Sequence, residues 1–448
     1  MAVFDEFAAF ITDTIYDEIP GEVVDEAKLS LLDIIGALLI GEKSELGELI
    51  DGLNVPGAPR EATVLPSGKK TDALSVIQVN SSAAHCSEID NIHPGAIVCI
   101  GGMVVPAALA WAERNKRSGR DLLAAIVIGS EAGIRLGASV FGGDLLKAGW
   151  WPSSIFGAFG VCAAVARLEG LTEYETRQAL SICSTMCGGF INGGAEGATA
   201  RHFMSGWSSR CGAASVLAAK AGFTGPLDAL EISQGAMAAR GLVPDFAGAV
   251  KGLGSEYRLS ETVYKSYASA MQSQSAVSAF LRLKETYSLK AKEIDSVCVE
   301  LPPRAFVVVQ SDGVPESHTT AAAHGKYLIA AAISDGDILP AQFDKEKIFD
   351  PEIRSFMKKV SVRQDKKLEK YAGKWPARVF VSCKDGKSYD TEVIDWMEGV
   401  PRKTFVEKKF KRVLKAAGEA NRTKTIMGLV TGLETANGVR NLIAAICD

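Results

Sequence analysis

Helical periodicity fills the first half of the chain, and this pattern limits the possible fold more than any other feature of the sequence. Between residues 23 and 39, apolar side chains recur three and four positions apart, which is the spacing of one buried helix face. Thr172 and Glu175 form the capping-box pattern that begins a helix. Glycine, alanine and serine are frequent inside these segments, which indicates closely packed helices. Further helices are predicted over 3–16, 121–140, 153–168 and 208–221.

After about Tyr264 the pattern becomes mixed. Two alternating segments, 377–383 and 388–393, flank an Asp-Gly pair, which is a strong signal for a hairpin turn. Because strands and helices are segregated along the chain, the sequence predicts a mostly α fold with an α+β second part, and not a parallel α/β sheet. The other predicted elements are a small hairpin at 61–70, strands at 297–301, 306–309 and 360–363, a helix at 320–333 and a helical tail from Phe405.

Size and charge exclude several classes of protein. A chain of 448 residues suggests two or three domains, and a net charge of −4 gives no electrostatic reason to expect nucleic-acid binding. No apolar run is expected to be long enough to span a bilayer, and the acidic N-terminus lacks the basic region of a signal peptide. The nine cysteines contain no C-x-x-C pair, which favours a reduced, cytoplasmic protein. A basic face in the tail, Lys408, Lys409, Lys411 and Arg412, is interpreted as solvated.

Reactive side chains are concentrated in a polar turn between two apolar helical segments. This turn and its edges carry His85, Glu88, Asp90, Asn91 and His93. Loops held by rigid elements are where reactive groups are usually placed, so these carboxylates and imidazoles are candidate acids and bases. The alternative is a polar loop in which the same side chains cap helices or bind water.

Several segments together resemble the MmgE/PrpD family, which includes 2-methylcitrate dehydratase, cis-aconitate decarboxylase and iminodisuccinate epimerase. The sequence HCSEIDN at 85–91 is similar to the family's His-Ala-x-(Asp/Glu)-x-Asp-Asp motif. Gly197-Ala-Thr-Ala-Arg201 is similar to its Gly-Thr-x-x-Lys region. Further similar segments are VPAALA at 105–110, Gly149-Trp150, GFTGP at 222–226, Tyr267, Tyr327, and Gly399 with Pro401. Each segment alone is weak, but their order and spacing carry the resemblance.

The resemblance implies an architecture and a type of chemistry. It implies an all-helical domain built from both chain ends, residues 1–265 and 405–448, with an inserted α+β lid domain at 266–404. It also implies a homodimer without a metal or another cofactor. The expected substrate is a small carboxylate bound between the domains, where negative charge builds up beside a carboxylate during the reaction.

The chain departs from the family at several reactive positions. The histidine of the family's His-Pro-Gly falls on Cys99, whereas a His-Pro-Gly occurs six residues earlier, at His93. Either His93 supplies this imidazole after a shift of the loop, or Cys99 takes its place, or the role is lost. Arg201 stands where the family has lysine. Other family histidines fall on Trp151, Met204 and Gln274. These changes make 2-methylcitrate dehydration itself less expected than a related carboxylate reaction.

From the resemblance we assign candidate roles. Arg201 is expected to bind a substrate carboxylate, because its planar guanidinium can form a bidentate hydrogen-bonded contact. Glu88, Asp90 and His93 are candidate proton carriers, and Tyr327 is a candidate donor to the leaving group. Candidate substrate-binding residues are His85, which would orient its loop, His202, Gln274 and His324; His318 is expected to flank a helix start.

The predicted function is therefore a cofactor-independent lyase of dehydratase type, acting on a small di- or tricarboxylic acid. Two alternatives remain open: an epimerase, isomerase or decarboxylase of a related acid, and a non-catalytic carboxylate-binding descendant.

Overall fold

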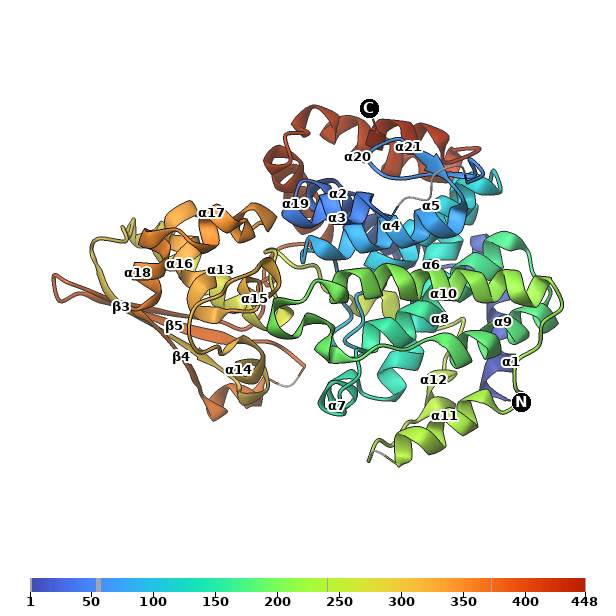
Figure 1. Cartoon of the computed structure of the whole chain (residues 1–448), viewed down its shortest axis with the longest axis horizontal. Coiled ribbons are helices and arrows are strands. Elements are labelled where there is room, and N and C mark those ends of the chain that lie inside the picture. The colour runs from blue at the N-terminus through green and yellow to red at the C-terminus, as the bar shows by residue number, and fades with distance from the viewer. Residues whose placement is uncertain (1, 54–57, 240, 372, 448) are drawn as a thin grey trace.

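The structure is a computed structural model that describes residues 2–53, 58–239, 241–371 and 373–447. It confirms a mostly α fold with an α+β second part (Figure 1). The helices of the larger part are α1 (Val3–Asp13), α2 (Gly21–Glu42), α3 (Glu45–Asp51), α4 (Ala73–Cys86), α5 (Ile100–Arg114), α6 (Gly119–Ser139), α7 (Gly142–Lys147), α8 (Pro152–Glu169), α9 (Glu173–Met186), α10 (Ala200–Lys220), α11 (Ala229–Ala238), α12 (Phe246–Ala249), α19 (Arg402–Ala416), α20 (Thr423–Thr431) and α21 (Arg440–Cys447). A small hairpin, β1 (Ala62–Thr63) with β2 (Lys70–Thr71), joins α3 to α4.

Close helix contact explains the small residues of the first half. A Cβ atom added at Gly129 of α6 would lie 2.6 Å from the carbonyl oxygen of Gly160 in α8, and one at Gly133 would lie 2.8 Å from that of Phe156. Such distances leave no room for a side chain, so these glycines set the separation of α6 and α8. The predicted capping box at Thr172 is confirmed, with its hydroxyl accepting from Glu175 N.

The second part is built around a four-stranded sheet in the order β4-β3-β5-β6. Strand β3 runs parallel to β4 and antiparallel to β5, and the predicted hairpin joins β5 to β6 with Ala377 opposite Val393. Helices α13 and α16 pack against these strands. The elements are α13 (Gln274–Tyr287), β3 (Ile294–Leu301), α14 (Pro303–Val309), α15 (His318–Ala321), α16 (Gly325–Asp335), α17 (Lys345–Ile348), α18 (Pro351–Met357), β4 (Val360–Gln364), β5 (Ala377–Cys383) and β6 (Ser388–Val393).

Two hydrophobic cores meet in the middle of the molecule. The first is formed by buried residues between 4 and 264 and between 406 and 446, so both chain ends contribute to it. Helix α19 packs against α2, and Figure 1 shows the C-terminal helices beside the N-terminal ones. The second core lies between 268 and 393, and it also takes in Ala37, Ile40, Ile89 and Val413. Residues near 89 therefore lie at the junction of the two cores.

Two element predictions were wrong. The strand expected at 306–309 is part of helix α14, because Pro302 and Pro303 stand at its N-cap and first position, where proline favours a helix start. The helix expected at 320–333 is two helices, α15 and α16, and the His324 side chain caps the second.

The expectation that no segment could span a membrane also needs correction. Among the described residues, α6 is long and apolar enough to do so, with a mean hydropathy of 1.4 over its most apolar 18 residues. However, 89% of that stretch is buried inside the protein, and core helices of folded domains pass the same test. Its buried charges, Glu131 and Arg135, are paired at 2.9 Å.

Candidate active site

The polar turn after α4 has a strained backbone that two buried lysines hold in place. Glu88 has a φ of +53°, which is unfavourable for a residue with a side chain and persists only where the surroundings enforce it. Lys265 Nζ donates to the Glu88 carbonyl oxygen at 3.1 Å, and Lys409 Nζ donates to the Ile89 carbonyl oxygen at 2.6 Å. Lys409 also pairs with Asp33 of α2 at 2.5 Å. The turn is thus tied to both ends of the chain.

The side chains of this turn form a buried cluster of charges. Asp90 lies 3.0 Å from His85 Nδ1 and 3.2 Å from Lys265 Nζ. Arg201, from the first turn of α10, places Nη2 2.9 Å from the Glu88 carboxylate. The side chains of His85, Glu88, Asp90 and Lys265 are at most 3% exposed, whereas 25% of Arg201 remains exposed. Arg201 is therefore the member of the cluster that solvent and solutes reach.

The neighbouring charges set the protonation states of the cluster. Burial disfavours both carboxylates, but Arg201, His85 and Lys265 lower the pKa of Glu88 to about 2. Lys265 and His85 likewise hold the pKa of Asp90 far below its usual range. Burial would lower the pKa of His85, yet the Asp90 carboxylate and its hydrogen bond raise it to about 9. At neutral pH the cluster thus contains three cations and two anions, which leaves one net positive charge.

The raised pKa of His85 predicts how stability depends on pH. The pKa is about 9 in the folded protein against roughly 6.5 in an unfolded chain. Protonated His85 should therefore stabilise the fold fully below pH ~6.5, and this contribution should disappear as the pH rises through about 9. Relative to His85→Gln, the wild-type free energy of unfolding should fall by roughly 3 kcal/mol over that range. Urea denaturation of both proteins at several pH values measures it; parallel curves would contradict the assignment.

Two further histidines extend the cluster toward the second core. The His202 ring lies 5.9 Å from that of His85 and 6.2 Å from that of His318, which is the first residue of α15. Burial lowers the pKa of both His202 and His318, so both are neutral at pH 7. His85 Nε2 and His202 Nδ1 are buried and make no hydrogen bond within the described protein. These nitrogens are thus available to a bound molecule.

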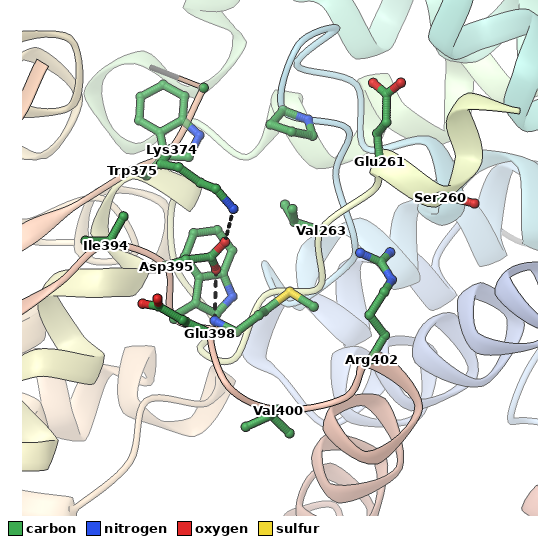
Figure 2. Close-up of a pocket in the computed structure, with 14 residues that line it drawn as sticks. Ser260, Glu261, Val263, Lys374, Trp375, Ile394, Asp395, Glu398, Val400 and Arg402 are labelled. Carbon is green, nitrogen blue, oxygen red and sulfur yellow. Dashed lines mark hydrogen bonds and ion pairs between the residues drawn. The ribbon is translucent and has the colours of Figure 1, made fainter. Parts of the chain in front are cut away.

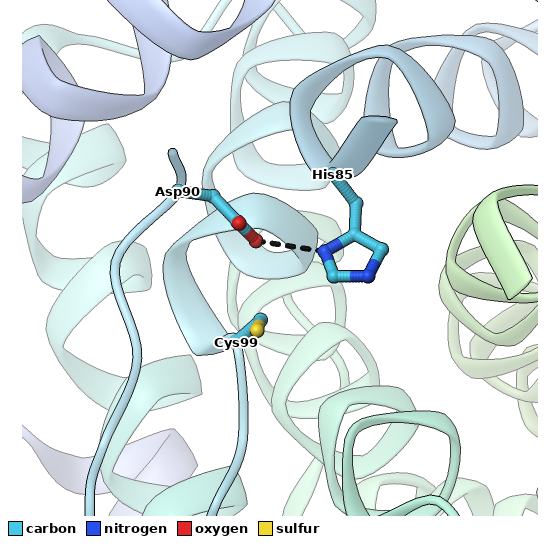
Figure 3. Close-up of side chains that lie close together, drawn as sticks. All are labelled: His85, Asp90 and Cys99. Atoms are coloured by element: carbon cyan, nitrogen blue, oxygen red, sulfur yellow. Dashed lines mark hydrogen bonds and ion pairs between the residues drawn. The ribbon is translucent and has the colours of Figure 1, made fainter. Parts of the chain in front are cut away.

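Two groups of side chains have the spacing of metal ligands. One ligand atom from each of His85, Asp90 and Cys99 lies within 4.8 Å of the others (Figure 3). The same holds for His85, Glu88 and His202. Their carboxylates, however, are already neutralised by Lys265 and Arg201. A divalent ion would either have to displace these cations or be repelled by them, so the donor set does not fit a metal well.

Two residues predicted to be catalytic lie in other surroundings. His93 is buried, with Nε2 3.0 Å from Glu261 and Nδ1 accepting from Ala96 N at 3.0 Å. The charges that act on it are Glu261 and Arg258, and not the carboxylates of the cluster. The Tyr327 hydroxyl donates to the Gln342 carbonyl oxygen. In the part of the chain that the structure describes, neither His93 nor Tyr327 contacts Glu88, Asp90 or Arg201.

Beside His93 lies a pocket of about 390 Å³, shown in Figure 2, whose walls come from 260–263 and 373–402. Its two cations are paired within the protein, Lys374 with Asp395 at 2.6 Å and Arg402 with Glu26 at 2.5 Å, and Glu261 and Glu398 add negative charge to its walls. It is therefore a less suitable site for an anionic ligand than the cluster.

Two predicted substrate-binding residues hold the backbone. His324 Nδ1 accepts from Tyr327 N at 3.3 Å and so begins α16. Gln274 Oε1 accepts from Ser266 N at 2.8 Å and from Tyr267 N at 3.0 Å. Because these amides directly follow Lys265, Gln274 fixes the loop that carries this cation.

Sequence reasoning missed Lys265 and Lys409. The interpretation of Lys409 as part of a solvated basic face was wrong, because its side chain is 4% exposed and paired with Asp33. Asp33 was the available signal: it interrupts the apolar run LLDIIGALLI of α2, and a carboxylate at such a position requires a buried partner. Lys265 gave a weaker signal, as a single cation in a segment of small and aromatic residues.

Comparison with known proteins assigns the family. The MmgE/PrpD N-terminal domain model matches residues 5–247, and the MmgE/PrpD C-terminal domain model matches residues 267–434. A cis-aconitate decarboxylase-like protein of Aspergillus oryzae is 25% identical, with 98% of this chain and 96% of that protein covered. A cis-aconitate decarboxylase of Aspergillus terreus is 26% identical (98% and 95% covered), and one of Mus musculus is 24% identical (97% and 90%). Because the two family models together account for most of the sequence, the chain belongs to the MmgE/PrpD family.

Proposed function

We propose that this protein is a lyase that acts on a small di- or tricarboxylic acid through a carbanion beside a carboxylate. The observation that carries the proposal is the buried cluster of His85, Glu88, Asp90, Lys265 and Arg201, with its net positive charge. A fixed excess of cations in a buried site stabilises developing negative charge strongly, because no solvent has to reorganise. The MmgE/PrpD family and the names of the relatives support an enzyme acting on carboxylic acids.

In this proposal the cations bind the substrate and His85 supplies the proton. The exposed side of Arg201 binds a substrate carboxylate, while its other side stays on Glu88. Asp90 accepts a hydrogen bond from His85 Nδ1, which leaves the Nε2 proton of the imidazolium for the substrate. When a carbon–carboxylate bond breaks, CO₂ leaves and its electron pair stays on carbon. A proton from His85 then completes the product, and water restores the imidazolium.

The names of the relatives favour loss of CO₂ over loss of water. We therefore take cis-aconitate as the first test substrate, with decarboxylation as the expected reaction. Dehydration of a hydroxy acid and epimerisation use the same cations and the same proton donor, so they are the alternative outcomes. No metal or organic cofactor is required for any of these steps.

The test is an assay of purified protein in D₂O with cis-aconitate and a panel of hydroxy acids, followed by NMR. Release of CO₂ with one deuteron added at carbon supports decarboxylation. An unsaturated acid without CO₂ release indicates dehydration, and deuterium exchange without either product indicates epimerisation. The absence of turnover and of exchange across the whole panel would reject a catalytic role.

We also propose that the protein is a homodimer that associates through the first half of α10. Phe203 and Trp207 stack at 6.2 Å and are 44% and 51% exposed, and Ile191, in a helical turn that contacts α10, is 44% exposed. Exposed apolar groups of this kind mark interaction surfaces. Trp207→Glu is expected to lower the solution mass from twice 47.5 kDa to a single chain mass, as measured by light scattering. Val307→Glu, at an exposed apolar residue of α14, is the matched control; dimers in both variants would place the interface elsewhere.

A further inference from the structure

Cys99 has a position that no other described cysteine shares. It is the N-cap residue of α5, and its backbone N–H donates to Ser153 Oγ at 3.1 Å, which fixes where the helix starts. Its sulfur lies within 4.8 Å of ligand atoms of both His85 and Asp90. Figure 3 shows these three side chains close together, from the end of α4, the polar turn and the start of α5.

The electrostatic surroundings of Cys99 are those of the cluster. Its sulfur interacts with His85, Arg201 and Lys265, which are the three cations of the site. Cys86 offers a contrast, although it follows His85 directly and is the last residue of α4. Its thiol donates to the Ala83 carbonyl oxygen at 3.2 Å, and burial raises its pKa to about 12. Proximity to the polar turn is therefore not enough: among the described cysteines, Cys99 alone lies beside His85, Arg201 and Lys265.

We propose that Cys99 is a catalytic residue that passes the proton from His85 to the substrate carbon. This inference rests on the proposed function. In the step, the S–H bond of Cys99 breaks as the new C–H bond forms at the carbanion, and the sulfur keeps the electron pair. The imidazolium of His85 returns a proton to the sulfur, and water returns one to His85, so protons and electrons balance. The thiolate formed in between lies beside Arg201 and Lys265, which stabilise its charge.

The geometry favours this relay because two proton carriers lie close together, and the histidine is held by a carboxylate. Asp90 holds His85 through Nδ1, which restricts how far the ring can follow a substrate. The Cys99 sulfur already lies within 4.8 Å of ligand atoms of His85 and Asp90, so a proton has a short path from the imidazolium to the thiol. The arrangement also predicts that a bound carboxylate shields this thiol from alkylating reagents.

The experiment uses the full-length protein and four variants: Cys99→Ser, Cys99→Ala, Cys298→Ser and His85→Gln. Cys298 is partly buried in β3, outside the cluster, and serves as the control. With cis-aconitate, or whichever acid of the panel is turned over, kcat of both Cys99 variants should fall by about 10²–10⁴-fold. Their KM should stay close to the wild-type value, because Arg201 and Lys265 still bind the substrate. Cys298→Ser should keep both constants.

Alkylation provides a readout that a purely structural cysteine would not give. Iodoacetamide should inactivate the wild type at the rate at which the Cys99 adduct appears by mass spectrometry, and saturating substrate should slow both several-fold. Adducts on the more exposed Cys187, Cys298, Cys383 and Cys447 should form without loss of turnover. Full turnover by Cys99→Ser and Cys99→Ala, beside an inactive His85→Gln, would overturn the role of Cys99 and leave the proposed function standing. A wild type that turns over no acid of the panel would instead overturn the proposed function, and this inference with it.

Discussion

Replacing His85 by glutamine is expected to lower kcat by about 10²–10⁴-fold, the usual contribution of a positioned acid or base. Glutamine can still donate a hydrogen bond to Asp90, but its amide does not carry a transferable proton at neutral pH. The fold should persist, because the Asp90 carboxylate keeps Lys265 at 3.2 Å. Steady-state kinetics with the acid that the wild type turns over measures the loss, and circular dichroism checks the fold.

His93→Gln is the matched comparison for this prediction. His93 is as deeply buried as His85, with 1% of its side chain exposed, and it also contacts a carboxylate at 3.0 Å, that of Glu261. Because Arg258 and Glu261 surround it in place of the cluster, its loss should affect stability more than kcat. If His93→Gln lost turnover and His85→Gln kept it, the proton donor would lie on the other side of the polar turn.

Local patterns in the sequence were sufficient to predict most of the fold. The spacing of apolar residues predicted α2, α6 and α8, and the Asp-Gly turn predicted the hairpin of β5 and β6. Where the prediction failed, the deciding signal was also local. The prolines at the start of α14 outweigh the β propensity of the Phe306–Val309 segment, because they set the backbone of the first helical turn.

The candidate site was only partly predictable, because its members come from distant parts of the chain. Glu88 and Asp90 stand out in the sequence, and the resemblance points to Arg201. No local pattern shows that Lys265 reaches Asp90, 175 positions earlier, or that Lys409 reaches Ile89, 320 positions earlier. His93 shows the converse: it is three positions from Asp90, yet its side chain is bound to Glu261. Closeness in sequence therefore did not predict which side chains contact one another.

The cluster combines catalytic potential with a high dependence on charge pairing. Three cations and two carboxylates lie together, and all but Arg201 are at most 3% exposed, so each buried charge is tolerated only while its partners remain. The same burial that strengthens the interaction with an anionic substrate raises the cost of losing any member. The stability of the protein and its proposed activity should therefore respond together to substitutions in the cluster, and less so to substitutions of exposed charges.

Replacing Lys265 by methionine tests this dependence most directly. The side chain is 3% exposed and its ammonium lies 3.2 Å from Asp90 and 4.0 Å from Glu88. Methionine has a similar length but no charge, so Asp90 loses a cation and the Glu88 carbonyl oxygen loses its donor. Breaking a buried pair in this way is expected to lower the free energy of unfolding by about 3–5 kcal/mol. Urea denaturation at neutral pH and a fixed protein concentration measures the change.

Two further variants separate the loss of the charge pair from a general loss of packing. Lys411→Met, at an exposed position of α19, should leave the free energy of unfolding nearly unchanged. Adding Asp90→Asn to Lys265→Met should recover part of the lost stability, because it removes the carboxylate that was left without its lysine. Turnover should stay low in the double variant, since the substrate then meets neither Lys265 nor the anchored imidazolium of His85. If Lys265→Met were as stable as Lys411→Met, the Lys265–Asp90 pair would contribute little, and the turn would owe its strained conformation to Lys409 and Arg201.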